Sequence, residues 1–247
     1  MTRAAVKLPL SIEVEMEKVG VIIPTYNRRA IVLECMRALW VHINDAVLIF
    51  YVGIDGTDDT IEFLRMYEKK APCLGVQVIP VENKPRLGLG ANLNNLLRMC
   101  QEDYIIQLDD DHILTRSIDL APHIQKLKDD RTAGWIRLMG IGSHNYRATL
   151  KGDYWYIDWQ CQELYIPSNR PHIKHKRFHE FFGYYPVARK LGETEEGFCH
   201  QCKDKAREAI EHSQAVPAPL PHVLVPLNSN SETAWQHVGQ SFQLQGE

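Results

Sequence analysis

Three consecutive aspartates, Asp109, Asp110 and Asp111, have the residue type and spacing to hold a metal ion. They follow the apolar run from Tyr104 to Leu108, which predicts a short buried strand. In open α/β sheets, ligands bind in the crevice outside the carboxyl ends of the strands. Mg²⁺ and Mn²⁺ bind carboxylate oxygens and still leave positions for substrate phosphates. The triplet therefore suggests a site for a divalent cation and a diphosphate.

The triplet taken alone leaves two simpler interpretations open. A run of aspartates can be a solvated loop, or the acidic first turn of a helix, where negative charge complements the helix dipole. A calcium-binding loop fits poorly, because the spacing Asp-x-Asp-x-Asp-Gly with a later Glu is absent. The elements around the triplet are needed to decide between these interpretations.

The first part of the chain alternates strand patterns with helix patterns. Apolar runs typical of buried strands occupy residues 19–23, 46–52, 76–81 and 104–108. Between them, apolar residues recur at helical spacing over residues 31–40, 61–67 and 93–99. Four strands separated by three helices predict a parallel sheet built from right-handed βαβ units.

The chain after residue 115 has a less regular pattern. It predicts helices over 118–128 and 195–212, a strand over 134–141, an antiparallel strand over 153–159, and a proline-rich linker over 216–226 followed by a polar tail. The stretch from Arg170 to His179 is basic and rich in histidine. It could be a mobile loop that closes over a diphosphate, a surface facing an anionic acceptor, or a solvated loop.

The composition is that of an ordinary globular protein. Hydrophobic residues make up 45% of the 247 residues and the formal net charge is −3, which gives no general attraction to nucleic acid. No stretch reaches about 18 consecutive apolar residues, so no membrane span is expected. Residues 1–18 lack the apolar core of a secretory signal, and six cysteines in a chain of this length do not make a disulfide framework. These features indicate a cytoplasmic location.

Polar segments follow each of the four predicted strands. They are Pro24 to Asn27 after the first strand, Asp55 after the second, Asn83 to Gly88 after the third, and the aspartate triplet after the fourth. Because the carboxyl ends of parallel strands meet at one edge of a sheet, these segments should lie together and form a nucleotide-diphosphate site.

The same segments resemble the motifs of the GT-A fold glycosyltransferases, especially family 2. Residues 19–29, Val-Gly-Val-Ile-Ile-Pro-Thr-Tyr-Asn-Arg-Arg, resemble the opening of that family, and residues 55–60 resemble its second turn, one residue shorter. Residues 83–97 resemble its Asn-x-Gly-x-x-x-Ala-x-Asn helix start, and Asp109 to Asp111 its metal-binding Asp-x-Asp. The resemblance is good over 19–115, diffuse over 115–214 and absent beyond.

The resemblance implies an α/β fold of the GT-A type, with a mostly parallel central sheet flanked by helices and a smaller antiparallel portion on the acceptor side. It implies a domain over residues 1–214, with a nucleotide-binding half at about 19–115 and an acceptor half at about 116–214. Residues 215–247 would then be a linker and tail.

The resemblance also assigns roles to individual residues. Those assigned to the nucleotide-sugar donor are Pro24, Thr25, Tyr26, Asp55, Arg86, Asp109 and Asp110, and those assigned to Mn²⁺ or Mg²⁺ are Asp109, Asp111 and His200. Asp55 would accept a hydrogen bond from a uracil or guanine ring, and Arg86 would reach the base or a phosphate. The cation would stabilise the charge that develops on the leaving nucleoside diphosphate.

A transferase that inverts the sugar also needs a general base for the acceptor hydroxyl. The family places it in an acidic pair at the start of a late helix, and alignment on Phe198 puts Glu195 there, with Glu193 and Glu196 as weaker candidates. The alternative is that these acids only complement the helix dipole. His200, five residues after Glu195, would be an additional metal ligand or a surface residue.

The sequence therefore predicts a metal-dependent glycosyltransferase that moves a sugar from a UDP- or GDP-sugar to an acceptor hydroxyl. The alternatives are a nucleotidyltransferase and a non-catalytic module that binds sugar nucleotides or nucleic acid. A dinucleotide-binding oxidoreductase is excluded, because Gly88-x-Gly90 lacks the third glycine and follows the third strand. The acceptor, which could be a nucleic acid, and the oligomeric state stay open.

Overall fold

The computed structural model describes seven segments of the chain. They are residues 16–70, 75–139, 147–157, 170–187, 192–211, 222–226 and 234–238. None of the helices in these segments combines the length and apolarity needed to cross a membrane.

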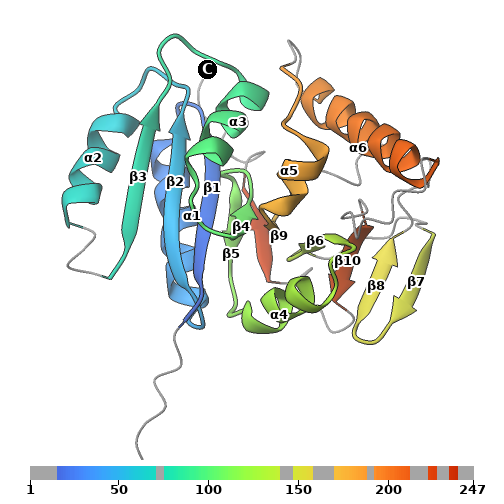
Figure 1. The fold of residues 1–247 in the computed structure, drawn as a ribbon. Helices are drawn as coiled ribbons and strands as arrows, with labels where there is room; N and C mark the ends of the chain where they lie inside the picture. Colours follow the sequence, from blue (N-terminus) through green and yellow to red (C-terminus); the bar gives the residue numbers. More distant parts are fainter. Residues whose placement is uncertain are drawn as a thin grey trace, which may run out of the picture.

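The described segments form an α/β fold in which helices cover both faces of a nine-stranded sheet (Figure 1). The strands are β1 (Lys18–Thr25), β2 (Val47–Ile54), β3 (Gln77–Glu82), β4 (Tyr104–Gln107), β5 (His112–Leu114), β6 (Ala133–Arg137), β7 (Ala148–Lys151), β8 (Tyr154–Ile157), β9 (His172–His175), β10 (His222–Pro226) and β11 (Trp235–His237). The helices are α1 (Arg29–His42), α2 (Thr60–Lys70), α3 (Leu89–Met99), α4 (Ala121–Asp129), α5 (Arg177–Phe182) and α6 (Glu193–Glu211). Strands β5 and β11 form a separate pair.

The first four strands form a parallel block at one end of the sheet, as the sequence predicted. Their order is β3-β2-β1-β4, and each neighbouring pair is parallel. This arrangement places the carboxyl ends of all four strands at one edge, so the polar segments that follow them meet there.

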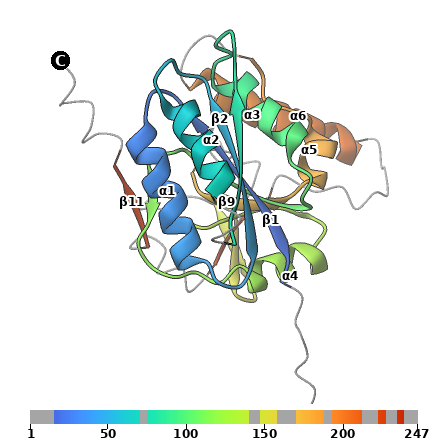
Figure 2. The same cartoon turned by 90° about the vertical axis from the view of Figure 1, so that its left-hand side faces the viewer.

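The two faces of the sheet bury separate apolar clusters. Figure 2 shows α1 and α2 on one side of the strands and α3, α5 and α6 on the other. Within β1, Val21 and Ile23 pack in the cluster that includes residues of α1 and α2, and Ile22 packs in the cluster that includes residues of α3, α5 and α6. A strand covered on both faces needs apolar side chains pointing both ways, which explains the continuous apolar run in β1.

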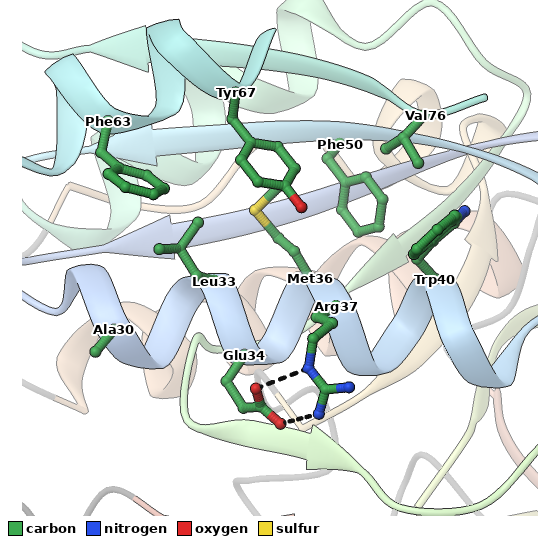
Figure 3. Close-up of a pocket in the computed structure, with 10 residues that line it drawn as sticks. All are labelled: Ala30, Leu33, Glu34, Met36, Arg37, Trp40, Phe50, Phe63, Tyr67 and Val76. Carbon is green, nitrogen blue, oxygen red and sulfur yellow. Dashed lines mark hydrogen bonds and ion pairs between the residues drawn. The ribbon is translucent and has the colours of Figure 1, made fainter. Parts of the chain in front are cut away.

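An apolar space lies between α1, α2 and β2 on one face of the sheet (Figure 3). This interhelical cavity, of about 210 Å³, is lined mainly by aromatic and aliphatic side chains: Leu33, Met36, Trp40, Phe50, Phe63, Tyr67 and Val76. Glu34 and Arg37 also line this cavity, and they form an ion pair in which Arg37 Nε lies 2.9 Å from Glu34 Oε2 (Figure 3).

The prediction of a basic loop over residues 170–179 is wrong. Residues 172–175 form β9, which lies between β4 and β6 and runs antiparallel to both. The side chains of His172 and Lys174 are buried, and Lys174 is 0% exposed. The sequence pattern was misleading because an interior strand carries cationic side chains that hydrogen bonds and aromatic rings accommodate.

The described parts of residues 215–247 also depart from the predicted linker and tail. Residues 222–226 form β10, an interior strand between β6 and β8. Residues 235–237 form β11, which pairs with β5 directly after the aspartate triplet. These strands belong to the same α/β unit as the first half, which the prolines between 216 and 226 concealed.

Candidate active site

All the residues assigned to the donor line one hollow at the carboxyl edge of the parallel strands. This rim cavity, of about 370 Å³, is lined by Pro24, Thr25, Tyr26, Arg28, Asp55, Arg86, Leu89, Asn92, Asp109, Asp110 and Asp111. They come from the ends of β1, β2 and β4 and from the loop and first turn at α3. The co-location that parallel strand topology predicts is therefore present.

The aspartate triplet is held from the end of β1. The Thr25 hydroxyl donates to Asp110 Oδ2 at 2.6 Å. Arg28 Nη1 lies 3.1 Å from both Asp110 Oδ1 and Asp111 Oδ2, so one guanidinium offsets the charge of two carboxylates. Sequence reasoning missed Arg28 as a site residue, although it lies within the motif at residues 19–29.

The charge on the triplet is only partly balanced. Burial, and then the negative charges of Asp111 and Glu195, raise the pKa of Asp109 well above its ordinary value. Burial also raises the pKa of Asp110, against the opposing effects of Thr25 and Arg28. Carboxyl groups whose pKa values are raised in this way favour binding of an additional cation, because the positive charge stabilises the ionised form of each carboxyl.

Asp111 and two nearby histidines have the arrangement of metal ligands. One ligand atom from each of Asp111, His112 and His237 lies within 4.8 Å of the others. His237 Nε2 is 3.3 Å from Asp111 Oδ2, while Asp111 Oδ1 is buried and has no hydrogen-bond partner among the described residues. Burial lowers the pKa of His112 to about 4, so its ring is neutral near pH 7 and able to ligate. These residues fit a divalent cation.

Strand pairing explains how His237 reaches the triplet. His237 lies opposite His112 in the β5–β11 register, and the Val238 N–H donates to the Asp111 carbonyl at 2.9 Å. The Trp235 indole N–H donates to the Leu138 carbonyl at 2.8 Å, which fixes β11 against the main sheet.

The histidine that lies beside Asp111 is thus His237, whereas the sequence led us to expect His200. His200 lies on α6 with an exposed side chain and is not part of the group formed by Asp111, His112 and His237. Its role as a ligand stays a prediction. His237 was missed because its position depends on pairing with β5, which the sequence pattern near residue 237 does not reveal.

The outer part of the rim cavity carries an exposed aromatic ring and a guanidinium that lies over it. The guanidinium of Arg86 lies 4.1 Å from the centre of the Tyr26 ring, and Tyr26 is 44% exposed. Asp55 accepts hydrogen bonds from the N–H groups of Leu87 and Gly88, both at 2.7 Å. Asp55 therefore shapes the loop that carries Arg86, a contribution that its expected role as a base acceptor did not include.

The start of α6 lies close to the start of α3. A Cβ atom at Gly90 would lie 2.4 Å from the Pro186 carbonyl oxygen and 3.0 Å from the Thr194 side chain. Glycine permits this close approach, which brings the first turn of α6 toward the triplet. Glu195 lies in that turn, and its charge contributes to the raised pKa of Asp109.

A model of the family described as glycosyl transferase family 2 matches residues 20–190, more than half of the chain. The chain belongs to glycosyl transferase family 2. The match includes the rim cavity residues from Pro24 to Asp111 and ends before Glu195 and His237. A comparison with curated proteins gave no match.

Solved glycosyltransferase structures share the GT-A fold of this chain. TarS 1–349 from S. aureus in complex with UDP-GlcNAc aligns over 91% of this chain and 61% of its own, with a TM-score of 0.60 and 15% identity. The mannosyltransferase PcManGT from Pyrobaculum calidifontis in complex with GDP-Man and Mn²⁺ aligns over 88% and 59%, with a TM-score of 0.55 and 18% identity. GalNAc-T7 with UDP, GalNAc and Mn²⁺ aligns over 88% and 45%, with a TM-score of 0.55 and 12% identity. The chain thus spans roughly half of the length of these proteins.

Proposed function

We propose that this chain is a metal-dependent glycosyltransferase that moves a sugar from a nucleoside-diphosphate donor to an acceptor hydroxyl with inversion. The observation that carries the proposal is the meeting of two groups at one sheet edge. One is the rim cavity, with its aromatic, cationic and carboxylate lining, and the other is the Asp111–His112–His237 group beside it.

In this proposal Asp111, His112 and His237 hold the cation. A bound cation supplies Lewis-acid stabilisation of the charge on the leaving diphosphate. A mixed set of carboxylate and imidazole ligands favours Mn²⁺ over Mg²⁺, which prefers oxygen ligands alone. Asp109 and Asp110 add negative charge around the site, and Arg28 is placed to pair with either a carboxylate or a phosphate oxygen.

The donor nucleotide would lie along the rim cavity with its base at Tyr26 and Arg86. A planar base can stack on an exposed aromatic or guanidinium face. Similar structures in complex with UDP-GlcNAc and with GDP-Man support a nucleoside-diphosphate donor and leave both bases as candidates.

Glu195 is the proposed general base. It lies in the first turn of α6, is partly exposed, and is close enough for its charge to act on Asp109. A base in this position would accept the proton of the acceptor hydroxyl as that oxygen attacks the sugar carbon.

The proposal is tested with a panel of UDP- and GDP-sugars in the presence of Mn²⁺, Mg²⁺ or EDTA. Nucleoside diphosphate should be released from one donor class with Mn²⁺ and not with EDTA. Release of pyrophosphate from nucleoside triphosphates would instead identify a nucleotidyltransferase, and binding of a sugar nucleotide without any turnover would identify a non-catalytic module.

The base is tested by Glu195→Gln. Transfer should fall by roughly a hundredfold or more, the contribution typical of a general base, while the Kd for the nucleoside diphosphate with Mn²⁺ stays unchanged. Glu193→Gln is the matched control, because it removes an acid from the same helical turn. Normal transfer by the Glu195 variant would exclude this residue as the base.

A further inference from the structure

Arg28 joins two carboxylates of the aspartate triplet to the rim cavity. Its Nη1 nitrogen lies 3.1 Å from Asp110 Oδ1 and 3.1 Å from Asp111 Oδ2. The Arg28 side chain is 33% exposed, whereas those of Asp110 and Asp111 are 5% and 12% exposed. The guanidinium therefore lies between carboxylates that are mostly buried and a cavity that a ligand can enter.

The Asp111 carboxylate is shared between Arg28 and the two histidines of the candidate metal site. Its Oδ1 lies 3.4 Å from His112 Nδ1, and its Oδ2 lies 3.3 Å from His237 Nε2. Asp111 Oδ1 and His112 Nδ1 are both buried, and neither has a hydrogen-bond partner among the described residues. These two atoms can ligate a cation without losing a hydrogen bond. Asp111 Oδ2, by contrast, is paired with Arg28.

A cation held by Asp111 and the guanidinium of Arg28 repel each other. An arginine side chain keeps its positive charge throughout the physiological pH range. Metal–oxygen bonds are about 2 Å long, so a cation bound to Asp111 Oδ2 would lie within roughly 5 Å of Arg28 Nη1. Both positive charges would then depend on the same carboxylate for compensation. Binding of the cation should therefore weaken the ion pair between Arg28 and Asp111.

The backbone on both sides of Arg28 is held in place, so a change of partner involves only its side chain. The Arg28 carbonyl accepts the Val32 N–H at 3.0 Å where α1 begins. Asn27 has a positive φ of 51°, and its side-chain oxygen accepts the Thr57 N–H at 2.7 Å. Rotation of the Arg28 side chain thus requires no movement of α1 or β1.

The diphosphate of a donor would offer Arg28 a second set of acceptors. Arg28 lines the rim cavity, in which that diphosphate would lie beside the aspartate triplet. A guanidinium binds phosphate oxygens through charge-assisted hydrogen bonds, with the same planar fork that it presents to carboxylates. Asp110 keeps the hydrogen bond from the Thr25 hydroxyl, at 2.6 Å, when Arg28 turns toward the phosphate.

We propose that Arg28 couples binding of the cation to binding of the nucleoside diphosphate. Paired with Asp111, Arg28 opposes binding of the cation; paired with the diphosphate, it leaves the carboxylate to the cation. The protein should therefore bind the cation weakly by itself and more tightly together with the nucleotide. Phosphate oxygens that ligate the cation add to this coupling, and Arg28 supplies the part that a substitution can remove. The inference rests on the proposed function, because it concerns the metal and the donor of that reaction.

The substitution Arg28→Gln tests the coupling, because it removes the charge and keeps a polar side chain. The Kd for Mn²⁺ alone, measured by electron paramagnetic resonance of free Mn²⁺, should fall by roughly fivefold or more as the competing charge is lost. The Kd for UDP or GDP at saturating Mn²⁺ should rise by roughly tenfold or more, because a charge-assisted hydrogen bond to phosphate is lost. Damage to the fold would weaken binding of both, so the opposite signs identify the role of Arg28.

Two further variants at the same position separate the effect of charge from that of shape. Arg28→Met removes the charge but keeps most of the length of the side chain, and it should shift both dissociation constants in the same directions as Arg28→Gln. Arg28→Lys keeps the positive charge, so its Kd for Mn²⁺ alone should stay within about twofold of the wild type.

Two other arginines provide matched controls. Arg86 Nε lies 3.7 Å from Asp55 Oδ2, and its guanidinium lies over Tyr26, so Arg86→Gln should weaken binding of UDP or GDP without tightening binding of Mn²⁺ alone. Arg29, the exposed neighbour of Arg28, pairs with Asp59, and Arg29→Gln should change neither dissociation constant.

An unchanged or increased Kd for Mn²⁺ alone in the Arg28→Gln and Arg28→Met variants would overturn the inference. An equal decrease in Arg29→Gln would also overturn it, because the effect would then belong to positive charge in general. If the wild type binds Mn²⁺ and releases nucleoside diphosphate from a sugar nucleotide, either result removes the coupling alone. If the wild type neither binds Mn²⁺ nor turns over any sugar nucleotide, the proposed function fails as well.

Discussion

Two cavities lie in the first half of this molecule, and they differ in size, position and chemistry. The rim cavity, of about 370 Å³, opens at the carboxyl ends of the strands, and four aspartates and two arginines are among its eleven lining residues. The interhelical cavity, of about 210 Å³, lies between α1 and α2 and is lined mainly by aromatic and aliphatic side chains (Figure 3).

The difference shows why volume alone does not identify a reaction site. Met36, Phe50 and Val76, which line the interhelical cavity, belong to the apolar cluster that packs α1 and α2 on the sheet. In the rim cavity, by contrast, charged groups lie partly away from bulk water. Burial of these charges is unfavourable, and binding of a ligand with the opposite charge offsets the loss of hydration. Substitutions in the rim cavity should therefore lower turnover, and substitutions in the interhelical cavity should lower the free energy of unfolding.

The largest effect is expected from Asp111→Asn in the rim cavity. The side chain keeps its size but loses the charge that the cation needs, so Mn²⁺-dependent turnover should drop by at least roughly a thousandfold. Nucleoside diphosphate binding measured by calorimetry should also lose its dependence on Mn²⁺. Asp59→Asn, an exposed aspartate paired with Arg29, is the control. Retained Mn²⁺-dependent turnover in the Asp111 variant would refute the metal site.

A smaller effect is expected from His237→Ala. Removal of one imidazole from the Asp111–His112–His237 group should weaken Mn²⁺ binding by at least roughly tenfold, while saturating Mn²⁺ restores part of the turnover. Gln236→Ala changes the adjacent exposed residue of β11 and should leave the Mn²⁺ titration unchanged. Equal Mn²⁺ affinity in the wild type and the His237 variant would show that β11 supplies no ligand.

The smallest effect on turnover is expected from Trp40→Ala in the interhelical cavity. Trp40 is 42% exposed and lines a different cavity from the charged groups of the rim, so kcat and KM should stay within about twofold of the wild type. The unfolding free energy should fall by about 1–2 kcal/mol, because part of an aromatic side chain loses its packing. A large loss of turnover without unfolding would connect the two cavities and contradict the distinction drawn between them.

The first half of the fold could be predicted from the sequence because its information is local. Each strand from β1 to β4 is an apolar run, each is followed by a polar turn, and parallel topology places the turns together. The residues from Pro24 to Asp110 that were assigned to the donor therefore line one cavity, together with Asp111, which was assigned to the metal.

The second half could not be predicted in the same way because its strands are defined by distant partners. Lys174 is cationic, yet it lies in an interior strand, since Gln107 accepts its hydrogen bond and aromatic rings cover it. His237 becomes a candidate ligand only through the β5–β11 register. No pattern within a few residues of either position records these long-range contacts.

The pairing of β11 with β5 also affects the order in which the candidate site is assembled during synthesis of the chain. The ribosome synthesises Asp111 and His112 more than a hundred residues before His237, so the aspartate triplet meets β11 only after residues 235–237 have been made. A nascent chain that ends before residue 237 can complete its parallel strands but lacks one imidazole of the cation group. The group formed by Asp111, His112 and His237 is thus completed only after residue 237 has been synthesised, when the four parallel strands β1 to β4 are already available to pair.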